Sequence, residues 1–290
     1  MPKKPDIKQT SRSVITLRFD DISVGWEYWV LLGTDVHHDS PWCRRELRHK
    51  HLDMVMEREG LAIECGDTFD AMSGKYDPRR SFSGVRPEDM VDDYMDSIVK
   101  HAVKDYAKYA DHFVLFSLGN HCTTLIKNGN TNPINRLVSG LNHKTSDGHQ
   151  IYSGLYAGSV RFMFTVNGTR RSSFNMKYNH GSGTNSPVTR GSIQTNRQAV
   201  FIPDADIVYN GHNHQAYIIP IARERMTPTG KVKKDLVYFI RTPGYKDEWG
   251  DGAEGYAVER GMGPTPNGAC WLRFYLEDQA VKVQPILEIE

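Results

Sequence analysis

The chain has 290 residues, in which 36 Lys and Arg stand against 35 Asp and Glu, giving a formal net charge of +1. This balance excludes the strong overall basic field of a dedicated nucleic-acid binder and leaves room only for a local basic groove. No uncharged apolar stretch approaches the about 18 residues of a membrane span, and no apolar core follows the charged N-terminus as it does in a signal peptide. We therefore expect a soluble, cytoplasmic protein.

The composition points to one domain and to reduced cysteines. Nothing marks a linker, so a single domain is expected over residues 14–290 after a polar N-terminal tail at 1–13. Cys43, Cys65, Cys122 and Cys270 show neither CxxC pairing nor zinc-ribbon spacing. A disulfide framework or a cysteine-bound zinc is therefore not indicated.

The first half of the chain alternates between apolar runs and helical patterns. Apolar runs at 28–34, 61–65 and 113–118 predict buried strands, and apolar spacing of three and four residues predicts helices at 40–60 and 87–110. Strands joined through helices favour parallel pairing. The fold class predicted here is α/β.

The second half is richer in strand signals. Asn167-Gly168 predicts a tight hairpin between strands at 158–166 and 172–178. Further strand pairs are expected at 216–222 with 236–241 and at 270–276 with 281–289, in a mostly antiparallel sheet. Residues 242–269, rich in Gly and Pro, are too long for a plain connection, so a rim or lid over a site and an ordinary surface loop are both open.

Five motifs rich in carboxylate, amide and imidazole groups follow one another along the chain. They are Asp35-Val36-His37, Gly66-Asp67-Thr68-Phe69-Asp70, Gly119-Asn120-His121, His180 and Gly211-His212-Asn213-His214. Three of these motifs directly follow an expected strand, and the apolar run at 207–210 leads into a fourth motif. The side chains of the motifs should therefore meet at one edge of a sheet. Oxygen and nitrogen ligands without thiolate suit Mn²⁺, Fe or Zn²⁺ better than Ca²⁺ or Cu(I). The motifs together predict a site for two metal ions.

This ordered set resembles the signature of the calcineurin-like metallophosphoesterase superfamily: D-x-H, G-D-x-x-D, G-N-H-[DE], a later H, and G-H-x-H. The match spans residues 28–216. The resemblance implies two packed mixed β-sheets flanked by helices, a four-layer αββα sandwich. It also implies a dinuclear metal centre where the strand ends converge.

The resemblance further implies a role for each matching residue. One metal would be held by Asp35, His37, Asp67 and His214, and the other by Asp67, Asn120, His180 and His212, with a metal-bridging hydroxide as the nucleophile. His121 would protonate the leaving oxygen and Asp70 would orient His121. Cys122 departs from the pattern, because the superfamily usually has an acidic residue there.

The substrate has to be sought outside the motifs. Scattered arginines, including Arg79, Arg80 and Arg190, could bind a phosphate backbone, and Tyr245, Trp249 and Arg260 are candidate substrate-binding residues. We favour a nuclease or phosphodiesterase acting on DNA or nucleotides, resembling the DNA-repair exonuclease branch. The alternatives are a phosphomonoesterase acting on proteins or nucleotides, a cyclic-nucleotide phosphodiesterase, and a binding or scaffold protein on the same fold. No oligomeric state is indicated.

Overall fold

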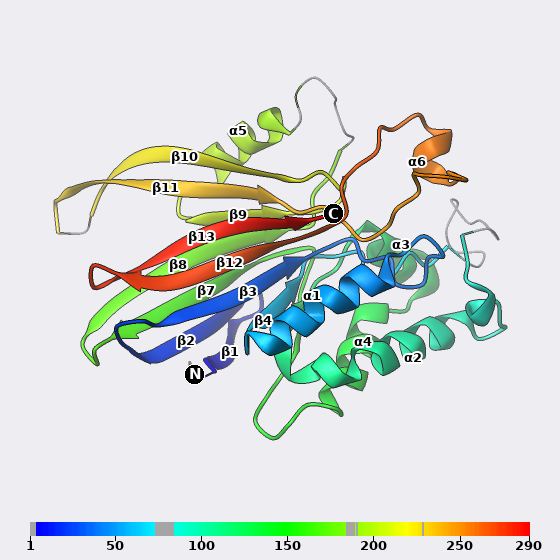
Figure 1. Ribbon diagram of the computed structural model, residues 1–290, viewed down its shortest axis with the longest axis horizontal. Coiled ribbons are helices and arrows are strands. Elements are labelled where there is room, and N and C mark those ends of the chain that lie inside the picture. The colour runs from blue at the N-terminus through cyan, green and yellow to red at the C-terminus, as the bar shows by residue number, and fades with distance from the viewer. Residues whose placement is uncertain (1–3, 73–83, 184–188, 190, 228) are drawn as a thin grey trace.

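The computed structural model describes residues 4–72, 84–183, 189, 191–227 and 229–290, which form two sheets flanked by helices (Figure 1). In spatial order the larger sheet contains β1 (Asp6–Ser11), β2 (Val14–Ile22), β7 (Ala157–Val166), β8 (Arg170–Asn179), β9 (Ile207–Asn210), β11 (Val232–Arg241) and β10 (Tyr217–Met226). The smaller contains β13 (Ala280–Ile289), β12 (Gly268–Glu277), β3 (Glu27–Gly33), β4 (Leu61–Glu64), β5 (Phe113–Phe116) and β6 (Tyr152–Ser153).

Both sheets mix parallel and antiparallel pairs. Strands β3, β4, β5 and β6 run parallel, which confirms the pairing predicted for the first half. The predicted hairpin of β7 and β8 is also confirmed. The single, mostly antiparallel sheet expected for the second half is wrong: β9 lies parallel between β8 and β11, and β12 pairs with β3 in the other sheet.

Apolar residues fill the spaces between these layers. One cluster, which includes Leu32, Phe162 and Phe274, lies between the two sheets. A second packs the outer face of the smaller sheet against helices that include α1 (Arg45–Glu57), α2 (Tyr94–Tyr106) and α4 (Pro133–Asn142). A third lies between the larger sheet and the region of α5 (Ser192–Phe201). The αββα layering implied by the resemblance is therefore confirmed.

Several boundaries differ from those expected. The first helix begins at Arg45 rather than near residue 40, and the second pattern is divided into η1 (Pro87–Asp89), α2 and η2 (Ala107–His112). Residues 6–11, expected in a polar tail, form the edge strand β1, whose mostly exposed side chains explain the polar signal. No helix among the described residues is long and apolar enough to cross a membrane.

The carboxyl ends of the central strands share one side of the molecule. Figure 1 shows β3 and β11 pointing toward the side that carries α3 (Asn120–Gly129) and α6 (Tyr256–Glu259). The five motifs lie in the loops or helix start that follow β3, β4, β5, β8 and β9. The fold therefore delivers them to a common edge, as the strand pattern predicted.

Candidate metal centre

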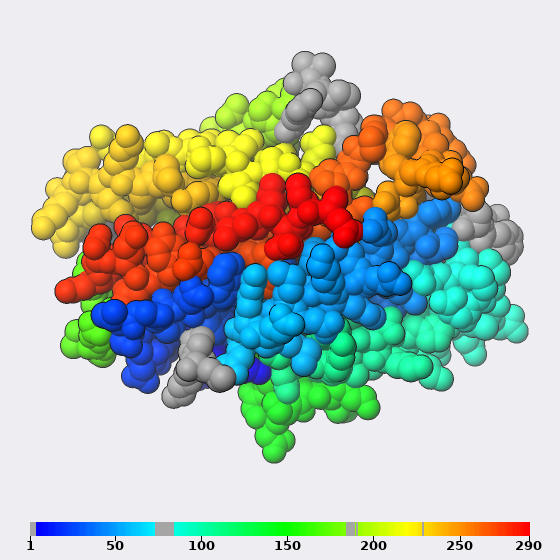
Figure 2. Space-filling model, viewed as in Figure 1, coloured from blue at the N-terminus to red at the C-terminus, as the bar shows by residue number. Residues whose placement is uncertain are grey.

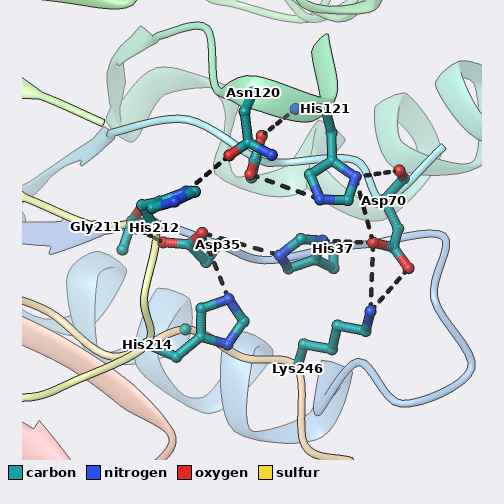
Figure 3. A network of polar contacts seen from close by, with 12 residues as sticks. Asp35, His37, Asp70, Asn120, His121, Gly211, His212, His214 and Lys246 are labelled. Atoms are coloured by element: carbon teal, nitrogen blue, oxygen red, sulfur yellow. Dashed lines mark hydrogen bonds and ion pairs between the residues drawn. The ribbon is translucent and has the colours of Figure 1, made fainter. Parts of the chain in front are cut away.

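Seven side chains from five segments meet at this edge, and we call them the strand-end cluster. They are Asp35, His37, Asp67, Asn120, His180, His212 and His214. Backbone bonds fix the first two loops against each other: the Asp35 N–H donates to the Gly66 carbonyl and the His37 N–H to the Asp67 carbonyl, both at 3.0 Å. Figure 3 shows several of these side chains turned toward one centre.

The first half of the strand-end cluster gathers around Asp35. Its Oδ1 lies 3.5 Å from His214 Nε2 and 3.9 Å from His37 Nε2. Its other oxygen, Oδ2, accepts the His212 N–H at 2.7 Å, which fixes the carboxylate. Among the described residues, Asp35 Oδ1 and His37 Nε2 are buried without a hydrogen-bond partner. Such groups are costly unless a further partner such as a cation joins them.

The second half gathers around Asp67 and His180. His180 Nε2 lies 3.0 Å from Asp67 Oδ2 and 3.2 Å from Asn120 Oδ1, and His212 Nδ1 lies 2.8 Å from the same amide oxygen. His180 Nδ1 donates to the Cys65 carbonyl at 2.7 Å, which turns Nε2 inward. Two groups, Asp35 with His37 and His214, and Asp67 with His180 and His212, each bring their ligand atoms within 4.8 Å of one another and could hold a metal ion.

Carboxylates and imidazoles shift one another's protonation. Burial alone would raise the pKa of Asp35 and of Asp67, but nearby imidazoles, His180 foremost, outweigh it and hold both below their usual range. Burial would lower the pKa of His180, but Asp67 and Asp35 raise it to about 9. Without a cation, protons on imidazole thus balance the buried carboxylates. A cation would provide the same positive charge.

The backbone of the cluster is held in an unusual conformation. Asp35, His37, Asp67, His212 and His214 have φ values of 48°, 47°, 46°, 79° and 55°. Each such non-glycine residue costs of order 1 kcal/mol and persists only where the surroundings impose it. Strain concentrated on these positions is typical of a functional site.

Two motif glycines make room for the cluster. Gly66 has a φ of +88°, and a Cβ there would meet the His180 ring. Gly119 lies so close to Asp67 that a Cβ would collide with its carboxylate. Gly66 therefore provides a sharp turn, whereas Gly119 allows the backbone to approach Asp67 closely.

His121 and Asp70 lie beside the cluster, but their contact differs from the expected one. His121 Nδ1 lies 2.6 Å from the backbone carbonyl of Asp70 and 3.5 Å from its carboxylate. The Asp70 carboxylate instead lies 2.8 Å from His37 Nδ1 and 3.1 Å from Lys246 Nζ. Asp70 thus orients His121 chiefly through its main chain and His37 through its side chain.

Cys122 is fully buried in the apolar cluster beneath the smaller sheet. Burial, with the nearby negative charges of Asp67 and Asp39, raises the pKa of its thiol far above the usual range. The fully buried Asp39 accepts the N–H groups of Asp70 and Ala71 at 2.7 and 2.8 Å. A carboxylate at position 122 would meet these charges, which accounts for a neutral residue there.

Sequence reasoning missed Asp39, Lys246 and Glu248. Lys246 Nζ lies between Asp70 Oδ2 at 3.1 Å and Glu248 Oε1 at 2.8 Å. Asp39 stands two residues after a predicted ligand, which was a usable signal. Lys246 and Glu248 carried none, because only the fold brings residues so distant in the chain to Asp70.

A cavity of about 290 Å³ opens above the strand-end cluster and is lined in part by residues 246–249, Tyr256, Ala257, Met262 and Thr265. Trp249 lines it as expected. Tyr245 is fully buried, with its hydroxyl 2.9 Å from His51 Nδ1, so it cannot stack on a substrate. Arg260 lies outside the lining and stands over the Tyr256 ring, 5.5 Å from its centroid. Arg79, Arg80 and Arg190 lie outside the described residues.

Comparisons with known proteins yield distant structural likenesses alone. No family model matches the sequence, and no curated protein matches it. Vacuolar protein sorting 29 from Cryptosporidium parvum is 12% identical over 91% of this chain and 100% of its own, with a TM-score of 0.37.

Two other solved structures show a similar level of likeness. The calcineurin-like phosphoesterase YfkN from Bacillus subtilis is 11% identical over 91% of this chain and 90% of its own, with a TM-score of 0.34. GAP50, the anchor in the inner membrane complex of Plasmodium, is 12% identical over 91% and 89%, with a TM-score of 0.43. These values are too low to carry a function across.

The chain's own motifs and geometry carry more weight. The five motifs occur in the superfamily's order, and the fold brings all of them to one edge of its strands. The chain thus resembles the calcineurin-like metallophosphoesterase superfamily both in its ordered motifs and in the two-sheet fold that assembles them.

Proposed function

We propose that the chain is a metal-dependent phosphoesterase, a hydrolase that cleaves phosphodiester bonds in DNA or nucleotides with two divalent cations. The observation that carries this proposal is the strand-end cluster, in which two groups of donor atoms lie side by side. Asp35 Oδ1 and His37 Nε2 support it, because both are buried without hydrogen-bond partners among the described residues and a bound cation would give each of them one.

The donor set fits such cations. The proposed ligands form two sets that share Asp67: Asp35, His37 and His214 for one ion, and Asn120, His180 and His212 for the other. Carboxylate, amide and imidazole donors without thiolate favour Mn²⁺, with Fe or Zn²⁺ as alternatives. When bound, two such cations lower the pKa of a water molecule and stabilise the phosphate during displacement.

The remaining residues position donors and move a proton. His121 Nδ1 donates to the Asp70 carbonyl, which leaves its Nε2 facing the strand-end cluster, 3.9 Å from Asp67 Oδ2. In its protonated form His121 can donate from Nε2 to the departing oxygen. The Asp70 carboxylate fixes Nδ1 of His37 and leaves the Nε2 of that ring to face the cluster. Asp70 is in this respect a positioning residue.

The arginines inferred from the sequence give little support to a long nucleic-acid strand as substrate. No described arginine lines the cavity. Arg86 donates instead to the Ser40 carbonyl at 2.8 Å. Among the substrates considered, the geometry therefore favours a nucleotide over a DNA strand.

A side-by-side assay tests the proposal. Mn²⁺-loaded protein would be given bis(4-nitrophenyl) phosphate, 4-nitrophenyl phosphate, single- and double-stranded DNA and a cyclic nucleotide, with Asp67→Asn as the blank. We expect diester hydrolysis that the blank lacks. Hydrolysis of the monoester alone would establish the phosphomonoesterase alternative. A folded protein with no turnover and less than one bound Mn²⁺ per chain would favour a scaffold.

A further inference from the structure

Residues 245–265, which we call the roof segment, supply about half of the residues that line the cavity. Figure 2 shows most of this segment, in orange, projecting at one end of the molecule. Its start is fixed to the body: the Asp247 N–H donates to the Trp42 carbonyl at 2.9 Å, and Lys246 Nζ reaches Asp70. The start of the roof segment is therefore anchored close to the strand-end cluster.

The roof segment also has its own internal brace. The Ala257 N–H donates to Glu248 Oε2 at 2.6 Å, while Lys246 Nζ lies 2.8 Å from the other oxygen of Glu248. Ala257 follows Tyr256 at the start of α6. A continuous set of polar contacts thus runs from Asp70, beside His37, to the short helix that bears Tyr256.

Large uncharged side chains line the cavity on this side. Trp249, Tyr256 and Met262 come from the roof segment, and Met72 comes from the loop after Asp70. Tyr256 is 53% exposed, so part of its ring is available to a ligand. Aromatic and thioether groups bind flat, uncharged molecules well, since they offer large polarisable surfaces with few polar groups to desolvate.

The charges of the roof segment disfavour a polyanion. It contains five acidic residues against two basic ones, Lys246 and Arg260. Lys246 is already paired with Asp70 and Glu248, while Asp247 and Glu248 line the cavity. A nucleic-acid strand depends on cationic groups along its backbone, and this segment would repel it.

We propose that the cavity takes a small phosphate ester whose flat, uncharged substituent, an aryl ring or nucleobase, packs against Trp249, Tyr256 and Met262. This inference rests on the proposed function and names its substrate class. The phosphate would lie over the strand-end cluster and the substituent under the roof segment. A volume of about 290 Å³ is at the lower end of ligand cavities and suits one such group.

Calorimetry with two phosphonates that the enzyme cannot hydrolyse tests this proposal without any turnover. Phenylphosphonate and methylphosphonate carry the same anionic group and differ only in the flat substituent. We expect Mn²⁺-loaded protein to bind phenylphosphonate at least about tenfold more tightly. Trp249→Ala should reduce that ratio several-fold. Tyr256→Ala, which removes a more exposed ring, should do the same.

A control and a competitor complete the test. Phe201→Ala, which removes a 75% exposed aromatic ring outside the cavity, should leave the ratio unchanged. A single-stranded oligonucleotide of about 20 residues should not displace phenylphosphonate. Equal affinity for the two phosphonates, no binding of either, or displacement by the oligonucleotide would each overturn the inference. Loss of hydrolysis with the affinity ratio intact would instead count against the proposed function alone.

Discussion

The strand-end cluster and the roof segment lie on either side of one cavity and are built in opposite ways. In the cluster, buried or half-buried side chains, strained backbone and close-fitting glycines leave each group little choice of position. The roof segment is mostly exposed, has one four-residue helix and is tied down by a few polar contacts. The difference suggests that the chemistry requires fixed geometry, whereas recognition of the ester substituent tolerates a cavity wall that is more exposed and held by fewer contacts.

The largest expected effect comes from Asp67, which the two proposed ligand sets share. Asp67→Asn keeps the shape of the side chain but removes half of its oxygen donors and its charge. We expect loss of at least one bound Mn²⁺ per chain and a fall in turnover of at least about a thousandfold. Elemental analysis and diester hydrolysis measure the two effects. Wild-type metal content in this variant would remove Asp67 from the shared position.

An acidic residue at position 122, where the superfamily usually has one, should destabilise the part of the fold that holds the strand-end cluster. Cys122→Asp would place a carboxylate in a fully buried apolar site near Asp39 and Asp67. We expect a loss of unfolding free energy on the order of 3 kcal/mol. Cys122→Ala, the control, should cost about 1 kcal/mol. Denaturant titration would contradict this account if the aspartate variant proved as stable as wild type.

His121 separates proton transfer from metal binding. His121→Ala should retain the metal content of wild type and lower turnover at least about tenfold, because the proton donor to the leaving oxygen is lost. The effect should be smaller for a 4-nitrophenyl ester, whose leaving group needs little protonation. An equal loss for good and poor leaving groups would show that His121 acts otherwise.

Lys246 joins the two regions. Lys246→Met keeps the length and apolar stem of the side chain but leaves Asp70 and Glu248 without their shared cation. We expect about a tenfold loss of Mn²⁺ affinity through the Asp70–His37 contact. Lys108→Met, which breaks the exposed pair with Asp53, is the matched control. Unchanged affinity in Lys246→Met would show that the roof segment is independent of the cluster.

The smallest effect concerns His51, whose Nδ1 lies 2.9 Å from the hydroxyl of Tyr245 at the buried start of the roof segment. Burial, aided by Arg48, lowers the pKa of His51 from 6.5 to about 4. Unfolding lets His51 take up a proton in this range, so it contributes stability above pH 6.5 that is lost as the pH falls toward 4. His51→Gln should therefore show a smaller acid-induced fall in unfolding free energy than wild type, with exposed His143→Gln as the control. Parallel pH profiles for wild type and His51→Gln would disprove this.

The cluster could be predicted from the sequence because its residues follow strands in short motifs. Asp35, Asp67 and Asn120 each come just after an apolar run, and parallel strands place such positions together. The Asp70 contact could not be foreseen, since it depends on whether the main chain or the side chain faces His121. Tyr245 looked like a binding residue, yet its hydroxyl serves a buried contact with His51.

The second half of the chain was harder to predict from the sequence for a related reason. Strand pairs such as β12 and β13 were visible, but their choice of sheet depends on packing between residues far apart in sequence. The contacts that join Lys246 to Glu248 and Glu248 to Ala257 correspond to no pattern in the sequence. Local patterns foretold the elements and the metal-ligating groups, whereas contacts across the cavity required the fold.

The most direct test of the central claim is the number of divalent cations bound by the wild-type chain. Purified protein would be stripped with a chelator, titrated with Mn²⁺ in a calorimeter and checked by elemental analysis. The strand-end cluster predicts about two bound ions per chain, both lost together with activity on chelation. Less than one bound ion by a folded chain would contradict the account.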